Sequence, residues 1–405
     1  MSMTQGQFEA AIADGRWADL LKESFFRDPT TGNVHQRVAV GSAQSTFGSA
    51  GRGAAFDPSV AGIVALILSG TDANIDLQLD GKGTGGIDLV KLAKPLTQGR
   101  KWHPLLLSGG YVAKAASDVT GLNDPFGLCV LPSGLIAVSN SNGGNVSIVN
   151  PAKGTVLATV TVGTSPREIC FSATSNRLYV ANFTSGTVSV INPDNWTVVA
   201  TLTVGTNPLG CVWIPSTNTV YVSNSAADSV SVIDCATAAV TATITTGIGD
   251  FPNKFVFCPL NGNVYLTCNN ETTVKVISPS NNTVSTSITV GTAPGGICYS
   301  HRNERIYVAN VTSGNISVIN PNTNTVTATI TASSGVDGLC INAATDLLYA
   351  VVGSGNTVLI FNPATTTQYP SLTGQGSGPR GIAFVPHLGG VAFCALSDDK
   401  LVTLS

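Results

Sequence analysis

Short runs of apolar and β-branched residues alternate with clusters of turn residues along residues 105–405. Within one unit the runs cover 169–171, 178–182, 187–191 and 198–204, and each has the length of a β-strand. The clusters between them are rich in Asn, Gly, Ser, Thr and Pro, which supply left-handed or proline-fixed backbone at low cost. This pattern predicts a four-stranded antiparallel meander in each unit.

One position, called the marker here, recurs at the same place in each unit. It recurs every 41 to 44 residues and is occupied by Pro125, Pro166, Pro208, Pro252, Pro294, Val336 and Pro379. A period in the forties, with only short strands inside it, is typical of propeller blades rather than of helical solenoids. Seven markers therefore predict an all-β, seven-bladed β-propeller.

The last unit stops after residues 401–404, which align with a third strand. The outermost strand of this unit must come from elsewhere in the chain. We expect the N-terminal strand 111–115, which reads Tyr-Val-Ala-Lys-Ala, to supply it and to close the ring. Closure removes the open sheet edge that would otherwise pair with another chain.

The second run of three units reads Tyr-Val-Ala-Asn or Tyr-Val-Ser-Asn, with weaker forms in three others. The strong copies are 179–182, 221–224 and 307–310, and the weaker ones are 136–140, 264–269 and 348–352. These residues resemble the YVTN family of β-propeller repeats over residues 105–405. The resemblance implies the propeller fold but no single function, because such propellers serve as surface adhesins, scaffolds and occasionally enzymes.

Charge is scarce in this chain. Charged residues make up 11%, Lys and Arg total 20, and the net charge is -3. A nucleic-acid partner would require a basic stripe, so we expect none. An export signal begins with cationic residues followed by apolar ones, whereas this N-terminus contains Glu9 and Asp14. The apolar stretch 60–68 is too short to span a bilayer. We therefore expect no cleavable export signal and no membrane insertion.

Five of the nine cysteines lie three or four residues after a marker, on the innermost strand of their blades: Cys129, Cys170, Cys211, Cys298 and Cys340. A small apolar side chain suits a crowded inner strand, so we expect buried, reduced thiols. Their spacing lacks the pairs typical of a zinc site. We expect no metal and no other cofactor.

The histidines predict no catalytic cluster, because His35, His103, His301 and His387 are scattered along the chain. His301 and His387 fall in predicted turns between first and second strands. Enzymes built on propellers place acids, Arg or His around the central mouth, whereas most of the corresponding positions in this chain are Gly. We therefore predict no enzymatic activity and no catalytic residues.

Five charged residues nevertheless lie one or two positions after a marker, where they should face the mouth of the propeller: Arg167, Glu168, Lys254, Asp337 and Arg380. Three hypotheses account for them. They bind a small anionic or sugar ligand, they form ion pairs between blades, or they are simply solvated.

The first hundred residues lack the repeat. Thr4 and Gln7 form a capping box, which predicts an N-terminal helix. Its apolar residues are candidates for attachment to another subunit: Phe8, Ile12, Trp17, Leu20, Leu21 and Phe25. We expect a helix followed by an extended arm over residues 1–60, of which residues 28–55 should be irregular. Residues 61–104 should form a small β unit and a linker. Strands of that unit are predicted at 61–68, 75–79 and 87–90.

Residues 69–77 and 81–85 resemble a segment of tailed-bacteriophage virion structural proteins, where it precedes variable outer domains. The resemblance implies a virion protein made in the host cytoplasm, attached to capsid or tail proteins by its N-terminal region. The propeller would face outward, in several copies or as a homo-oligomer, with a host glycan or receptor as a further partner. Capsid decoration, head fibre and tail component all stay open. The competing hypothesis is a bacterial propeller that binds a small ligand or sugar, or a lactonase-like enzyme.

Overall fold

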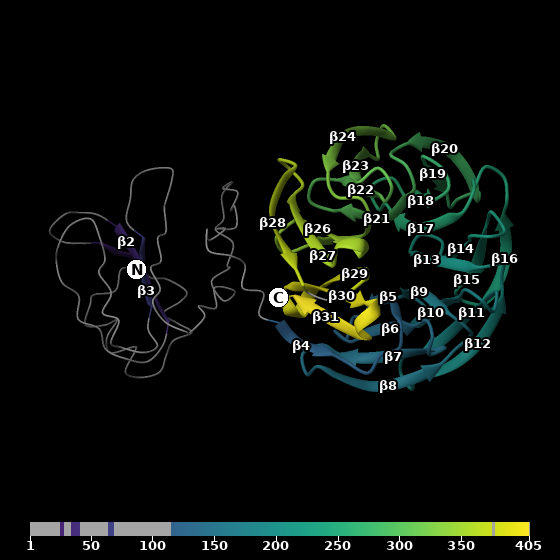
Figure 1. Ribbon diagram of the computed structural model, residues 1–405, viewed down its shortest axis with the longest axis horizontal. Coiled ribbons are helices and arrows are strands. Elements are labelled where there is room, and N and C mark those ends of the chain that lie inside the picture. The colour runs from purple at the N-terminus through teal and green to yellow at the C-terminus, as the bar shows by residue number, and fades with distance from the viewer. Residues whose placement is uncertain (1–24, 28–33, 41–63, 69–114, 375–376, 405) are drawn as a thin grey trace. The chain divides into compact units, whose positions relative to one another are not determined.

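The computed structural model describes residues 25–27, 34–40, 64–68, 115–374 and 377–404. The chain divides into two compact units, Met1–Lys101 and Trp102–Ser405. In the second unit, the described residues form seven four-stranded antiparallel sheets arranged as the blades of a propeller (Figure 1). The predicted all-β, seven-bladed propeller is therefore confirmed.

The first four blades follow one another along the chain. Blade 1 consists of β5 (Pro125–Val130), β6 (Ile136–Asn140), β7 (Asn145–Asn150) and β8 (Thr155–Thr161). Blade 2 consists of β9 (Pro166–Ser172), β10 (Arg177–Asn182), β11 (Thr187–Asn192) and β12 (Thr197–Thr203). Blade 3 consists of β13 (Pro208–Ile214), β14 (Thr219–Asn224), β15 (Ser229–Asp234) and β16 (Ala239–Ile244). Blade 4 consists of β17 (Pro252–Phe257), β18 (Val264–Cys268), β19 (Thr273–Ser278) and β20 (Thr283–Thr289).

The remaining blades complete the ring. Blade 5 consists of β21 (Pro294–Ser300), β22 (Arg305–Asn310), β23 (Asn315–Asn320) and β24 (Thr325–Thr331). Blade 6 consists of β25 (Val336–Asn342), β26 (Leu347–Val352), β27 (Thr357–Asn362) and β28 (Thr367–Thr373). Blade 7 consists of β29 (Pro379–Val385), β30 (Gly390–Ala395), β31 (Lys400–Leu404) and β4 (Ala115–Val119). In the last two blades, three single turns of 3₁₀ helix connect consecutive strands: Gly353–Gly355, Pro386–Leu388 and Leu396–Asp398.

Each marker residue begins the first strand of its blade. Proline suits this place because the first position of a strand can lack a backbone N–H. The residue before each marker has a positive φ, from 53° at Phe251 to 85° at Gly335. Each first strand contacts the first strands of both neighbouring blades, so the seven together surround the central axis (Figure 1).

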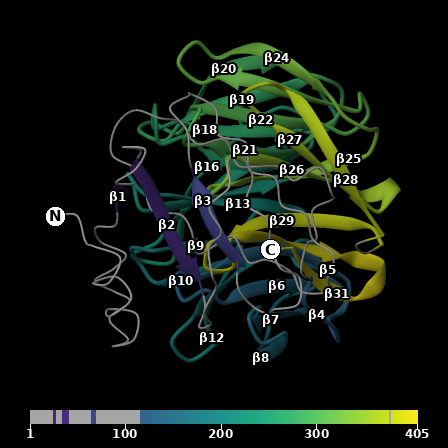
Figure 2. The ribbon, with the colours of Figure 1, turned by 90° about the vertical axis from the view of Figure 1, so that its left-hand side faces the viewer.

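Blade 7 combines the two ends of the propeller. Its third strand, β31, pairs with β4, with Leu401 opposite Val119 and Leu404 opposite Ala115. The side view shows this last blade, in yellow, beside the first, in blue (Figure 2). Of the predicted closing strand 111–115, residues 111–114 lie outside the described residues.

The hydrophobic core fills the wedges between neighbouring blades. Tyr179 and Val188 of blade 2 pack with Val220 and Ile233 of blade 3, and all four side chains are fully buried. Second and third strands are covered on both faces, so their sequences are almost continuously apolar. The fourth strands form the rim and are largely exposed, as in β12.

The asparagine that ends the repeat motif ties the second strand to the third. In blade 2, Asn182 Nδ2 donates to Ser189 Oγ at 2.9 Å and to Thr187 Oγ1 at 3.1 Å. Blades 1, 3 and 5 repeat this pair of bonds. Polar residues of the third strand thus satisfy the amide Nδ2 group. The Oδ1 atoms of Asn182 and Asn310 are buried without a hydrogen-bond partner among the described residues.

The N-terminal unit departs from two expectations. Its described strands, β1 (Phe25–Arg27), β2 (Val34–Val40) and β3 (Val64–Leu68), form one antiparallel sheet in that order. Phe25, predicted as the last residue of the helical stripe, begins β1, and β2 lies within the segment predicted as irregular. Pairing on both edges satisfies the backbone of β2, which local sequence signals did not reveal.

Several N-terminal predictions concern residues that the structure does not describe. Strand β3 lies within the predicted strand 61–68. The predicted strands 75–79 and 87–90 are outside the described residues, as are the other attachment candidates: Phe8, Ile12, Trp17, Leu20 and Leu21. Within the described part of the chain, no helix has the length and apolar character needed to cross a membrane.

Glycine occupies the second position after the marker in five blades because the next blade's backbone lies so close. A Cβ on Gly296 would lie 1.8 Å from the carbonyl oxygen of Asp337, and one on Gly210 would lie 2.1 Å from that of Asn253. Neither contact can be relieved by turning a side chain. The strands must move apart to accommodate any larger residue.

Replacing Gly296 with alanine should therefore lower the free energy of unfolding by about 1–3 kcal/mol, the usual cost of overpacking. Urea denaturation followed by circular dichroism would measure the change. Gly355→Ala is the matched control, because its Cβ would meet its nearest neighbour at an ordinary 3.5 Å. An equal loss in both variants would contradict a specific constraint at the axis.

Candidate functional site

The candidate site lies where the first strands begin, at the mouth of the propeller. Glu168 and Lys254 occupy, in blades 2 and 4, the position that is glycine in the other five blades. Arg167, Asp337 and Arg380 lie one residue after their markers. The sequence thus directs long charged side chains into a ring that otherwise presents mainly glycine there.

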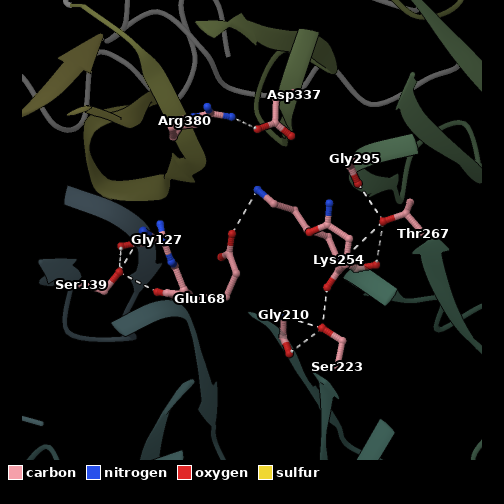
Figure 3. Close-up of polar contacts among 12 residues, drawn as sticks. Gly127, Ser139, Glu168, Gly210, Ser223, Lys254, Thr267, Gly295, Asp337 and Arg380 are labelled. Atoms are coloured by element: carbon pink, nitrogen blue, oxygen red, sulfur yellow. Dashed lines mark hydrogen bonds and ion pairs between the residues drawn. The ribbon is translucent and has the colours of Figure 1, made fainter. Parts of the chain in front are cut away.

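Glu168 and Lys254 pair with each other across an intervening blade. Lys254 Nζ lies 3.0 Å from Glu168 Oε1, and the two side chains are 16% and 18% exposed (Figure 3). Blade 3 stands between them, and it contributes Gly210 at the same position. Gly210 lines the same pocket as the two charged side chains.

A second ion pair joins the adjacent blades 6 and 7. Arg380 Nη1 lies 2.7 Å from Asp337 Oδ2 (Figure 3). The carboxylate side chain is 14% exposed, whereas the arginine side chain is 42% exposed. The outer edge of the Arg380 guanidinium therefore remains accessible to solvent.

The two pairs interact electrostatically. Burial alone would raise the pKa of the Asp337 carboxyl, but the charges of Lys254 and Arg380 outweigh burial and lower that pKa. Burial alone would likewise lower the pKa of the Lys254 ammonium, but Glu168 and Asp337 outweigh it and raise that pKa. Both groups therefore stay charged near neutral pH.

Arg167 is the member of the set without an ionic partner. Its guanidinium carbon lies 4.3 Å from the centre of the Phe126 ring and 5.1 Å from that of Phe183. Its Nε is buried, and no described residue forms a hydrogen bond with it. Burial, followed by repulsion from Arg380, lowers the pKa of this guanidinium, while Asp124 raises it. The five predicted residues thus comprise two ion pairs and one unpaired cation.

At the mouth, the first strands line a partly open cavity of about 120 Å³. Its polar lining includes Glu168 and Lys254, and its apolar lining includes Leu128, Ile297 and Leu339. Ligand pockets for drug-sized molecules are typically about 300–1,000 Å³. This cavity is too small for such a molecule.

Hydroxyl groups on second strands link neighbouring blades beside the site. Ser223 Oγ donates to the Asn253 carbonyl at 2.7 Å and accepts the N–H of Gly210 at 2.8 Å (Figure 3). Ser139 and Thr267 form the same bridge in blades 1 and 4. Sequence reasoning missed these bridges, although the variable third residue of the motif, Ser or Ala, was their signal.

The cysteines are core residues. All nine are free thiols, and each is buried or half-buried. Burial raises the pKa of Cys129, and separately that of Cys340, to about 12. Among the described residues, no three His, Cys, Asp or Glu side chains are placed to hold a metal ion together.

The histidines are spread over the chain as the sequence indicated. His301 is exposed between β21 and β22, where its ring lies 4.9 Å from that of Tyr299. His387 follows β29, and His35 lies in β2. His103 is outside the described residues.

Comparisons with known proteins agree with the fold. Residues 156–271 match the model of the YNCE-like beta-propeller family. Hydrazine synthase from Kuenenia stuttgartiensis is similar with a TM-score of 0.63 and 18% identity, over 74% of this chain and 99% of that chain. Virginiamycin B lyase from Staphylococcus aureus is similar with a TM-score of 0.59 and 14% identity, over 70% and 95% of the two chains.

A catalytically inactive variant of that lyase, solved with quinupristin, has a TM-score of 0.61 and 14% identity, over 71% of this chain and 98% of that chain. At such identities the likeness shows the fold alone. No curated protein sequence matches the chain. The matches support the predicted propeller repeats and give no support to the bacteriophage resemblance of the N-terminal region.

Lys254→Met should leave Glu168 as an unpaired charge in the mouth and lower the free energy of unfolding by about 1–3 kcal/mol. The double variant Glu168→Gln/Lys254→Met removes both charges and should recover most of that loss. Urea denaturation of the wild type and both variants would measure the difference. Equal destabilisation by the single and double variants would show that the ion pair is not responsible.

The contribution of the Asp337 carboxylate to stability should depend on pH. The pKa of this carboxyl is lowered in the folded protein. Its stabilising effect is therefore complete above the unfolded pKa of about 3.9 and is lost as the pH falls through the folded pKa. The stability difference between wild type and Asp337→Asn should therefore be constant from pH 7 to 5 and shrink below pH 4. Denaturation at each pH would test this, and a difference unchanged down to pH 2 would contradict it.

Proposed function

We propose that this chain is a non-enzymatic structural protein of a bacteriophage particle, which attaches through residues 1–60 and displays its propeller outward. The observation that carries the non-enzymatic part is the pairing of charges in the mouth. A general base that works near neutral pH needs a carboxyl pKa raised toward 7, whereas that of Asp337 is lowered. A nucleophilic lysine needs a lowered pKa, whereas that of Lys254 is raised.

The construction of the ring suits display. Strands β31 and β4 complete the last sheet, and the Ser139, Ser223 and Thr267 bridges join blades through buried hydrogen bonds. An exposed sheet edge is a route to aggregation and to pairing with other chains. Pairing with β4 covers the edge of β31, so this edge is not available to another chain.

The bacteriophage part rests on the resemblance of residues 69–77 and 81–85 to tailed-phage structural proteins. The candidate attachment residues Phe8, Ile12, Trp17, Leu20, Leu21 and Phe25 precede that segment. In this proposal the partners are capsid or tail proteins, the protein is located in the virion, and the propeller contacts the host surface.

Binding of a small ligand at the mouth is the second candidate function. The specific observation in its favour is the unpaired guanidinium of Arg167, which stacks on two aromatic rings. This candidate is compatible with display on a particle, since a displayed propeller can present a binding site.

Cryo-electron microscopy of particles from the source should show seven-bladed discs. Discs on the capsid lattice, in tens to hundreds of copies, would indicate a decoration or head-fibre role, whereas three- or sixfold arrays would indicate a tail component. A chain that lacks residues 1–60 should keep its propeller circular dichroism spectrum and disappear from the particles.

Point variants of the full chain provide a matched comparison. Phe8→Ser/Ile12→Ser should reduce incorporation at least about tenfold, because a tenfold loss corresponds to only about 1.4 kcal/mol of contact energy. Glu9→Gln, on the same predicted helix, should incorporate normally. Particles without the protein, or unchanged incorporation of the truncated chain, would overturn the proposal.

A further inference from the structure

The mouth of the propeller contains a guanidinium that the fold holds in place without neutralising. Arg167 stacks on Phe126 and Phe183, at 4.3 and 5.1 Å from the ring centres. Cation–π contact fixes the plane of the group but leaves its N–H donors free. The buried Nε of Arg167 has no hydrogen-bond partner among the described residues. No described carboxylate lies within ion-pair distance of the Arg167 guanidinium.

A buried donor without a partner costs free energy, and the cost falls when a ligand supplies an acceptor. The other cations nearby are already occupied. Lys254 pairs with Glu168, and Arg380 pairs with Asp337. Among the five charged mouth residues, Arg167 alone lacks an anionic partner of its own.

Resting on the second candidate function, the binding of a small ligand at the mouth, we infer that Arg167 anchors a small carboxylate there, with the exposed edge of Arg380 as its second contact. Arginine presents parallel N–H donors that match the two oxygens of a carboxylate. Arg380 is 42% exposed and repels Arg167, so an anion that contacts both would relieve this repulsion. One unpaired positive charge among the five residues matches a monoanion better than a phosphate dianion.

The size of the site limits what can enter it. The cavity at the mouth is about 120 Å³ and has Glu168 in its lining, so a second anionic group would be repelled there. The ligand therefore presents one carboxylate to Arg167 and keeps the rest of its atoms outside the ring. Both a free small acid and the uronic acid of a glycan have this chemistry.

Two nearby carboxylates, Asp124 and Glu168, oppose binding, and Asp124 has the larger effect on Arg167. Glu168 already pairs with Lys254, whereas Asp124 forms no ion pair with Arg167 within 4.0 Å. Asp124 has a φ of 55°, a conformation that asparagine also tolerates. Asp124→Asn should remove the competing charge without disturbing the fold.

Isothermal titration calorimetry with the full-length protein would test the site. Acetate and propionate serve as small free acids, and glucuronate is compared with glucose as an acidic and a neutral sugar. Acetate, propionate and glucuronate should bind, more weakly at high ionic strength, and glucose should not. Binding of the free acids alone would identify a small-acid site, and tighter binding of glucuronate would identify an acidic-sugar site. Phosphate that binds more tightly than any carboxylate, or the absence of carboxylate binding, would overturn the inference.

Three variants make the test specific. Arg167→Met, which preserves the apolar stack on Phe126 and Phe183, should weaken binding about ten- to a hundredfold. Asp124→Asn should strengthen it about two- to fivefold. Arg177→Met is the control, because Arg177 bonds to Asn176 and Asn192 away from the mouth and its loss should not change affinity.

Thermal melting would first establish that each variant is folded. If Arg167→Met fails to fold, Arg167→Lys keeps the charge and loses the fork, and it should still weaken binding measurably. Unchanged affinity in either folded Arg167 variant, or an equal loss in Arg177→Met, would show that the carboxylate does not bind at Arg167.

Discussion

The close approach of seven first strands around one axis is the constraint on which this structure depends. At Gly210 and Gly296 an added Cβ would meet the backbone of the next blade at 2.1 and 1.8 Å. Backbone therefore contacts backbone at the centre of the ring, where Ser223 and Thr267 add hydrogen bonds from one blade to the next. Apolar second and third strands then fill the wedges that widen outward, and the fourth strands meet solvent at the rim.

The same constraint decides what chemistry the mouth can offer. With glycine at five of the seven equivalent positions, only Glu168 and Lys254 extend from that layer, and they meet across blade 3. Arg167 and Arg380 project from the neighbouring layer, one residue nearer the marker. The narrow axis thus brings five charged side chains together, and pairing among four of them leaves one guanidinium for a ligand.

Spacing along the chain placed the charged residues at the mouth but not their partners. The spacing of Glu168 from its marker specifies its blade and its layer. Its contact with Lys254 joins two blades that are not neighbours, which the spacing does not specify. Phe183 follows β10 in a turn, and its contact with Arg167 comes from the packing of that turn. In the N-terminal unit, β2 formed within a segment predicted as irregular, because its stability comes from strands on both sides.

The sequence by itself determined the number of blades, the marker position of each blade and the identity of the charged residues at the mouth. It could do so because a regular period and the proline markers are local properties, repeated seven times along the chain. Only the tertiary structure decided which charges pair, the bounds and register of the strand that completes blade 7, and how closely the backbones meet. These depend on distances between segments far apart in the chain, as when β4 pairs with β31.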